Sequence, residues 1–130
     1  MAIVGLSSTI VTDKIVQCRD FYVEVFGGRV EFDCGWYASV VLAEGACVHF
    51  MAPRGPDARP YPGDGLVYNL RVDDVDAEHE RIVGIGLPIV SPLQDNPWGD
   101  RSFAIQDPAG VTLYVYTEIE PNEEFQSYFK

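Results

Sequence analysis

Residues 98–110, Trp-Gly-Asp-Arg-Ser-Phe-Ala-Ile-Gln-Asp-Pro-Ala-Gly, decide the fold of this chain. They predict a strand, a tight Asp-Pro-Ala-Gly turn and a return strand that ends at Thr117, because Asp, Pro and Gly favour turns between alternating apolar runs. A fainter copy of this plan occupies residues 36–51, with a Glu44-Gly45 turn between its two strands. Two such copies predict one small unit repeated around a shared cavity.

The remaining residues complete two copies of the order strand, helix, strand, strand, strand. In the first copy we expect a helix over 14–26 that Asp13 caps, and in the second a helix that Asp73-Asp74 caps and that runs to about Ile85. Pro88 and Pro92 place one strand of the second copy at a sheet edge or in an irregular stretch. The expected strands are 7–12, 29–34, 37–42 and 46–51 in the first copy, and 66–72, 88–94, 102–106 and 111–117 in the second.

The chain is therefore predicted to be a single α+β domain over residues 1–130, with two βαβββ modules that form curved mixed sheets around a cavity. The modules span about 6–52 and 66–117, a Pro- and Gly-rich connector spans 53–65, and a C-terminal helix spans about 121–130. The connector either crosses between modules or acts as a lid that closes Tyr61 over a ligand.

The last residues predict a short helix with an unusually aromatic stripe. Asn122 is expected to cap it, and Phe125, Tyr128 and Phe129 share one face. We expect that face to be covered by its own domain or by a second subunit, with a partner-binding tail as the alternative.

The charge and the cysteines narrow the class of protein. With 20 acidic and 9 basic residues the net charge is −11, which disfavours nucleic acid and anionic membranes as partners. The same negative charge either attracts a cationic small molecule or only keeps the protein soluble. No apolar run is long enough to predict a membrane span, and the N-terminal residues do not predict a secretory leader. We therefore expect a cytoplasmic protein. Cys18, Cys34 and Cys47 are expected to be buried free thiols.

Several features together resemble the vicinal oxygen chelate superfamily, which includes glyoxalase I, extradiol dioxygenases, and fosfomycin and bleomycin resistance proteins. They are the repeated βαβββ plan, Val11-Thr12-Asp13 with Asp20-Phe21-Tyr22, the run 72–77, and the turn 107–110. Pro97-Trp98-Gly99, followed by Arg101 and Phe103, is similar to the bleomycin-resistance branch. That resemblance implies an antibiotic-resistance homodimer that sequesters a cationic, planar-armed drug unchanged.

The resemblance also places the positions at which superfamily enzymes hold a divalent metal. They fall at Leu6 and Val67 on the first strands and at His49 and Tyr114 on the last strands. Leu and Val have no lone pair to donate, and a single His cannot complete a shell of three or four ligands. We therefore expect no metal and no cofactor. His79 lies on the second helix and is expected to point elsewhere.

Alternation along the strands extends those positions to a cavity wall. The wall is predicted to contain Leu6, Ser8, Ile10, Cys47, His49, Met51, Val67, Asn69, Arg71, Thr112, Tyr114 and Tyr116. From this wall and the open rim, the predicted ligand-binding residues are Ser8, Trp36, His49, Asn69, Trp98, Arg101, Phe103 and Tyr114. The alternatives are structural: the tryptophans fill the core, Arg101 pairs with Asp100 or Asp107, and Asn69 hydrogen-bonds Tyr114.

The leading hypothesis is a metal-free protein that binds an aromatic or cationic, drug-like small molecule and acts by sequestration. The alternative is a superfamily enzyme, a lyase, isomerase or dioxygenase, with His49 and Tyr114 as the candidate acid and base. A structural or regulatory partner domain is a third reading, for which the aromatic tail is the hint.

Overall fold

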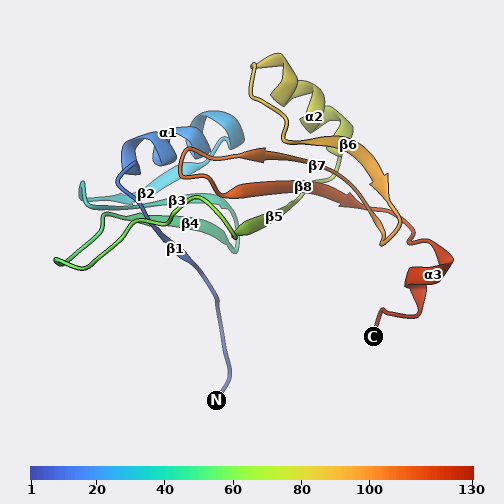
Figure 1. The fold of residues 1–130 in the computed structure, drawn as a ribbon, viewed down its shortest axis with the longest axis horizontal. Helices are drawn as coiled ribbons and strands as arrows, with labels where there is room; N and C mark the ends of the chain where they lie inside the picture. Colours follow the sequence, from blue (N-terminus) through green and yellow to red (C-terminus); the bar gives the residue numbers. More distant parts are fainter. The chain divides into compact units, whose positions relative to one another are not determined.

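The computed structural model describes residues 1–130. The chain divides into two compact units, residues 1–64 with 107–110 and residues 65–106 with 111–130. Each unit contains a four-stranded mixed sheet with a helix on one face (Figure 1). The fold is thus α+β with two repeated modules, as the sequence predicts.

The first unit follows the predicted element order closely. Its sheet has the strand order β1-β4-β3-β2, with β1 parallel to β4 and the other neighbours antiparallel. Helix α1 contacts β3 and β4, so one sheet face is covered and the other is left open. The elements are β1 (Thr9–Val11), α1 (Ile15–Phe26), β2 (Arg29–Asp33), β3 (Tyr37–Ala43) and β4 (Ala46–Met51).

The second unit repeats this arrangement with the order β5-β8-β7-β6, and β5 is parallel to β8. Strand β6 is at the edge, where the prolines place it, because proline cannot donate to a neighbouring strand. Helix α2 contacts β7 and β8. The elements are β5 (Val67–Arg71), α2 (Val75–Gly84), β6 (Ser91–Asn96), β7 (Asp100–Gln106), β8 (Thr112–Glu118) and α3 (Glu123–Gln126).

Each unit buries its core between its helix and its sheet. In the first, the ring of Tyr22 on α1 lies 5.6 Å from that of Phe50 on β4, and burial raises the pKa of the neighbouring Cys18 thiol to about 12. In the second, Ile82 of α2 is buried with Phe103 of β7. These apolar faces fix which side of each sheet remains available for a ligand.

The two helices begin differently. Asp74 caps α2 as predicted, since its carboxylate accepts a hydrogen bond from the Ala77 amide at 3.0 Å. The same prediction for Asp13 is wrong, because Lys14 is the N-cap residue of α1 and makes no side-chain cap. The hydroxyl of Thr12 instead accepts from the Lys14 amide at 3.0 Å. The short Thr12 side chain reaches this amide from the end of β1, so a carboxylate is not needed.

The C-terminal helix is shorter than predicted. It covers only Glu123–Gln126, and Asn122 makes no side-chain cap. Its own domain does not cover the aromatic stripe, because Tyr128 and Phe129 remain 70% and 64% exposed; cover by a second subunit stays a prediction. The predicted burial of all three thiols is also wrong, since Cys34 is exposed in the turn after β2. None of the helices is long and apolar enough to cross a membrane.

The connector is held within the first unit. The Tyr61 amide donates to the carbonyl of Val11 at 2.6 Å. Gly63 lies so close to Gly110 that a Cβ on Gly110 would stand 2.8 Å from the Gly63 Cα. Gly110 also has φ +93°, a backbone conformation that residues with a side chain rarely adopt. The Asp-Pro-Ala-Gly turn therefore requires glycine at position 110 for two reasons, the close approach of Gly63 and the positive φ. Asp107 of this turn accepts a 2.7 Å hydrogen bond from the buried Tyr22 hydroxyl.

Candidate functional site

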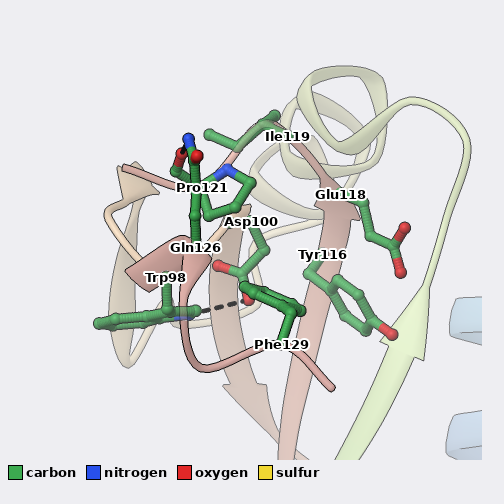
Figure 2. A pocket seen from close by; sticks show the side chains of 9 residues that line it. Trp98, Asp100, Tyr116, Glu118, Ile119, Pro121, Gln126 and Phe129 are labelled. Carbon is green, nitrogen blue, oxygen red and sulfur yellow. Dashed lines mark hydrogen bonds between the residues drawn. The ribbon is translucent and has the colours of Figure 1, made fainter. Parts of the chain in front are cut away.

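A pocket of about 800 Å³ opens in the second unit between its sheet and the C-terminal segment (Figure 2). Strand β8 contributes Tyr116 and Glu118, the loop before β7 contributes Trp98 and Gly99, β7 contributes Asp100, and the chain after β8 supplies the rest of the wall. The lining residues are Trp98, Gly99, Asp100, Tyr116, Glu118, Ile119, Pro121, Gln126 and Phe129. Aromatic rings and two carboxylates therefore share one cavity, a common composition for small-molecule sites.

The backbone around Gly99 brings this wall together. The Ile119 amide donates to the Gly99 carbonyl at 2.9 Å, and the Asn122 amide donates to the Pro97 carbonyl at 2.8 Å. Gly99 has φ +118°, and a Cβ there would lie 3.2 Å from the Cβ of Pro121. A glycine at this position lets the C-terminal segment pack against the loop that carries Trp98.

The carboxylate of Asp100 is held by three neutral donors. The Trp98 indole donates at 3.0 Å, the Tyr114 hydroxyl at 2.9 Å, and the Asn96 amide at 2.7 Å. Asn96 is buried and also donates to Ser102 at 2.8 Å. Burial raises the pKa of Tyr114, so its phenol stays protonated at neutral pH and remains a donor. We call Asp100, Trp98, Tyr114, Asn96 and Ser102 the Asp100 network.

No lysine or arginine pairs with Asp100. The second pocket carboxylate, Glu118, lies 3.3 Å from Arg71, but both side chains are more than half exposed, and such pairs contribute little. The pocket thus presents a fixed carboxylate with no cationic partner beside the rings of Trp98, Tyr116 and Phe129 (Figure 2). A flat cation would gain from both the charge and the ring faces.

The open face of the first sheet has a different arrangement. The Tyr37 hydroxyl and the His49 Nδ1 lie 2.7 Å apart, and Thr9 and Ser39 are the strand neighbours of His49. When Tyr37 donates to Nδ1, a neutral His49 carries its proton on Nε2. Next to this pair, the guanidinium of Arg54 lies 4.3 Å from the centre of the Trp36 ring.

Four of the predicted ligand-binding residues lie on or beside these open faces. Trp98 lines the pocket and Tyr114 belongs to the Asp100 network. Asn69 is the strand partner of Tyr114 and is exposed, but the Tyr114 hydroxyl donates to Asp100 rather than to Asn69. His49 lies in the first unit, where its partner is Tyr37.

Phe103 and Arg101 require correction. Phe103 is fully buried, and its ring lies 5.1 Å from that of His79 on α2. The guanidinium of Arg101 contacts Asp76 of α2 at 2.8 Å and Asp95 at 3.0 Å, not Asp100 or Asp107. These contacts raise the pKa of Arg101 and lower that of Asp76. Because side chains alternate along β7 and Asp100 faces the pocket, Arg101 and Phe103 face the helix.

The predicted wall on the first strand is out of register by one residue. Ile10 is buried opposite Phe50, on the side of α1, and Thr9 is the residue paired with His49. Leu6 and Ser8 precede β1 and are exposed. A shift of one residue moves every side chain of a strand to the other face, so the alternating set that starts at Leu6 leads to the core side.

The repeated stretches 36–51 and 98–110 each begin with a tryptophan, which predicts that Trp36 and Trp98 are equivalent, and this prediction is wrong. Ser39 pairs with His49 in the first sheet, and Ala104 pairs with Tyr114 in the second. Trp36 then corresponds to Arg101 rather than to Trp98. The sequence reasoning missed Asp100, Glu118 and Phe129 as site residues, although the period of two that gave Tyr114 and Tyr116 continues to Glu118.

The comparisons place this fold in a family. Residues 6–115 match the model of the Glyoxalase/Bleomycin resistance protein/Dioxygenase superfamily. The chain belongs to this superfamily. It is 31% identical to an uncharacterized Mycobacterium bovis protein over 118 residues, which cover 82% of this chain and 78% of that protein.

Two solved structures are similar along most of the chain. TnmS3, an antibiotic binding protein from Streptomyces sp. CB03234, is 26% identical with a TM-score of 0.70, over 91% of this chain and 98% of that one. The lactoylglutathione lyase from Agrobacterium tumefaciens is 20% identical with a TM-score of 0.72, over 89% and 95%. The second likeness shows the fold alone.

The divalent metal of the superfamily enzymes does not fit the residues of this chain. Of the four corresponding positions, Leu6 and Val67 have no donor atom. The Nδ1 of His49 contacts Tyr37, and the hydroxyl of Tyr114 donates to Asp100. No three His, Cys, Asp or Glu side chains gather closely enough to hold an ion.

Proposed function

We propose that this protein binds a planar aromatic cation in the pocket of its second unit and holds it without chemical change. The observation that carries the proposal is the Asp100 carboxylate, fixed by Trp98, Tyr114 and Asn96 at the wall of an aromatic pocket. Superfamily membership and the similarity to an antibiotic binding protein support a small-molecule ligand.

The site residues suit binding more than chemistry. Three hydrogen bonds occupy the Asp100 carboxylate, so it is preorganised as a counter-charge and costs little to arrange when a ligand arrives. Trp98 supplies a flat ring face, and stacking or cation–π contacts with this face contribute about 0.5–2 kcal/mol to the free energy of binding. The net charge of −11 favours the approach of a cation over long range.

The proposal is tested with two probes that share one ring system. The isomer 9-aminoacridine, called aminoacridine from here on, is a planar cation at slightly alkaline pH, whereas acridine is neutral. Calorimetric titration should show that the cation binds at least about tenfold more tightly, since only it gains from the carboxylate. Mass spectrometry of the released probe should show it unchanged.

Asp100→Asn should remove the preference for the cation, because the amide keeps an acceptor oxygen and loses the charge. Glu80→Gln is the matched control, since Glu80 is an exposed acid on α2 and its loss changes the net charge equally. If Glu80→Gln weakens the preference as much as Asp100→Asn does, overall charge rather than the pocket selects the ligand, and the proposal fails.

The Tyr37–His49 contact favours a second candidate function. When the Nδ1–H of His49 donates to the Tyr37 oxygen, the Nε2 lone pair is free to act as a general base. An isomerase or lyase that acts on the open face of the first sheet would use the pair in this tautomer. Turnover of a small organic substrate that His49→Ala abolishes, while the fold is kept, would support it. The predicted homodimer and the predicted cytoplasmic location stay predictions.

A further inference from the structure

A second pocket of about 170 Å³ adjoins the first one. Trp98 and Phe129 line both pockets, and Phe125 and Tyr128 complete the smaller one. Three of its four lining residues follow β8, so the C-terminal segment builds it. The aromatic side chains of this segment therefore form the wall of a pocket and do not pack in the core.

The two pockets differ in chemistry. The larger has the carboxylates of Asp100 and Glu118 and the amide of Gln126 on its wall. The smaller has four aromatic side chains and no charged group. The rings of Phe125 and Tyr128 meet edge to face with centroids 6.0 Å apart, which holds them as one apolar wall.

The volume of the smaller pocket sets the size of its occupant. The smaller pocket is open to solvent, and its volume of about 170 Å³ has room for one phenyl ring or a branched aliphatic group of that size, since benzene fits an enclosed apolar cavity of about 150 Å³. A fused ring system needs the larger pocket. The exposed rings of Tyr128 and Phe129 would lose contact with water when such a group enters, which favours binding.

We propose that the smaller pocket is a subsite for a phenyl-sized apolar arm of the ligand whose cationic ring system occupies the larger pocket. The inference rests on the proposed function and adds a ligand class to it: a planar aromatic cation with an apolar substituent. Trp98 and Phe129 lie where the two parts of the ligand join, since both pockets share them.

The test compares aminoacridine with its N-benzyl derivative by calorimetric titration. The benzyl compound should bind about tenfold more tightly to the unaltered protein, because a phenyl group leaves water. Phe125→Ala should bring the ratio of the two affinities close to one, since Phe125 lines only the smaller pocket. Tyr116→Ala is the control for the larger pocket, and it should weaken both compounds by the same factor.

Each outcome decides between the two proposals. Equal affinity of both compounds for the unaltered protein leaves the proposed function standing and overturns the subsite. Binding of neither compound overturns the proposed function and the subsite with it. An unchanged ratio in Phe125→Ala also overturns the subsite. Tyr128→Ala repeats the test at a residue that is 70% exposed, where substitution leaves the fold intact.

Discussion

The two sheets share one backbone plan but carry different chemistry on their open faces. On the first, a single contact joins Tyr37 to His49. On the second, the corresponding strands place Tyr114 against Asp100, and two further donors complete the Asp100 network. The strand pairs of the two units are equivalent, so the side chains alone give the second face a carboxylate held by neutral donors where the first face has a tyrosine–histidine pair.

The chain that follows the last strand of each module enlarges this difference. After β4 the connector returns to β1, where the Tyr61 amide donates to the Val11 carbonyl. After β8 the chain passes Gly99 and leaves aromatic side chains near Trp98. A module can thus gain a ligand pocket from a short appended segment while its sheet stays the same.

The largest effect on stability is expected from substitutions that break the Asp100 network and the Tyr37–His49 contact, one at a time. Asn96→Ala removes the buried amide that donates to both Ser102 and Asp100, and such a loss costs about 2 kcal/mol. Tyr37→Phe removes one half-buried hydrogen bond and should cost at most about 1 kcal/mol. Urea unfolding measures both free energies. Equal losses would show that the Asp100 network is no more tightly organised than the Tyr37–His49 pair.

The two tryptophans give the next test. Trp98→Ala removes a ring face and a donor to Asp100, so the affinity for aminoacridine should fall at least about tenfold. Trp36→Ala removes a ring that already stacks with Arg54 and should change the affinity less than about twofold. Calorimetric titration measures both. A larger loss in Trp36→Ala would move the ligand site to the first unit.

The helix-covered sides of the two sheets should also differ in how strongly alkaline pH destabilises them. The pKa of Cys18 is about 12 in the folded chain against its usual 9.0, so the thiol ionises first in the unfolded chain. Stability is therefore kept below about pH 9 and falls as the pH rises toward 12. Between about pH 8 and about pH 10 the loss should be about 1 kcal/mol.

Cys18→Ala isolates this thiol from the other groups that titrate in the same range. The variant should be less stable at every pH, because a buried side chain is shortened, but its stability should decline less between the two pH values. Urea midpoints in the presence of a reductant measure this. The same decline in both proteins would mean that another group is responsible.

The smallest effect is expected from substitution of Arg101. This substitution tests whether a side chain on the helix side of the second sheet affects a ligand on the open face. Arg101→Gln breaks the exposed contacts to Asp76 and Asp95, so the unfolding midpoint should fall slightly, and less in high salt. The affinity for aminoacridine should change less than about twofold. A large loss of affinity would show that Arg101 reaches the ligand after all.

The sequence was sufficient for the element order, the repeat and the α2 cap, because these follow from local patterns. The strand alternation was also correct along β8, where a long strand carries Tyr114 and Tyr116 to the same face. It failed in the first strand because β1 has only three residues, Thr9–Val11, which are too few to show on which face Ile10 lies.

The pocket itself could not be predicted from periodicity. The predicted strand 102–106 leaves Asp100 outside the sheet, yet Asp100 begins β7 and faces the pocket because Phe103, three residues later, must be buried. Phe129 was recognised as part of an aromatic stripe, but its nearness to Trp98 depends on backbone contacts of Gly99 and Pro97 with the C-terminal segment. Such contacts between segments leave no periodic signal.

The most direct test of the central claim is a crystal structure of the protein with aminoacridine bound. We predict that the ring system lies against Trp98 and that its amine donates to the carboxylate of Asp100, in the pocket of the second unit. A ring system seated beside His49 and Tyr37 instead, with the Asp100 network untouched, would contradict the account.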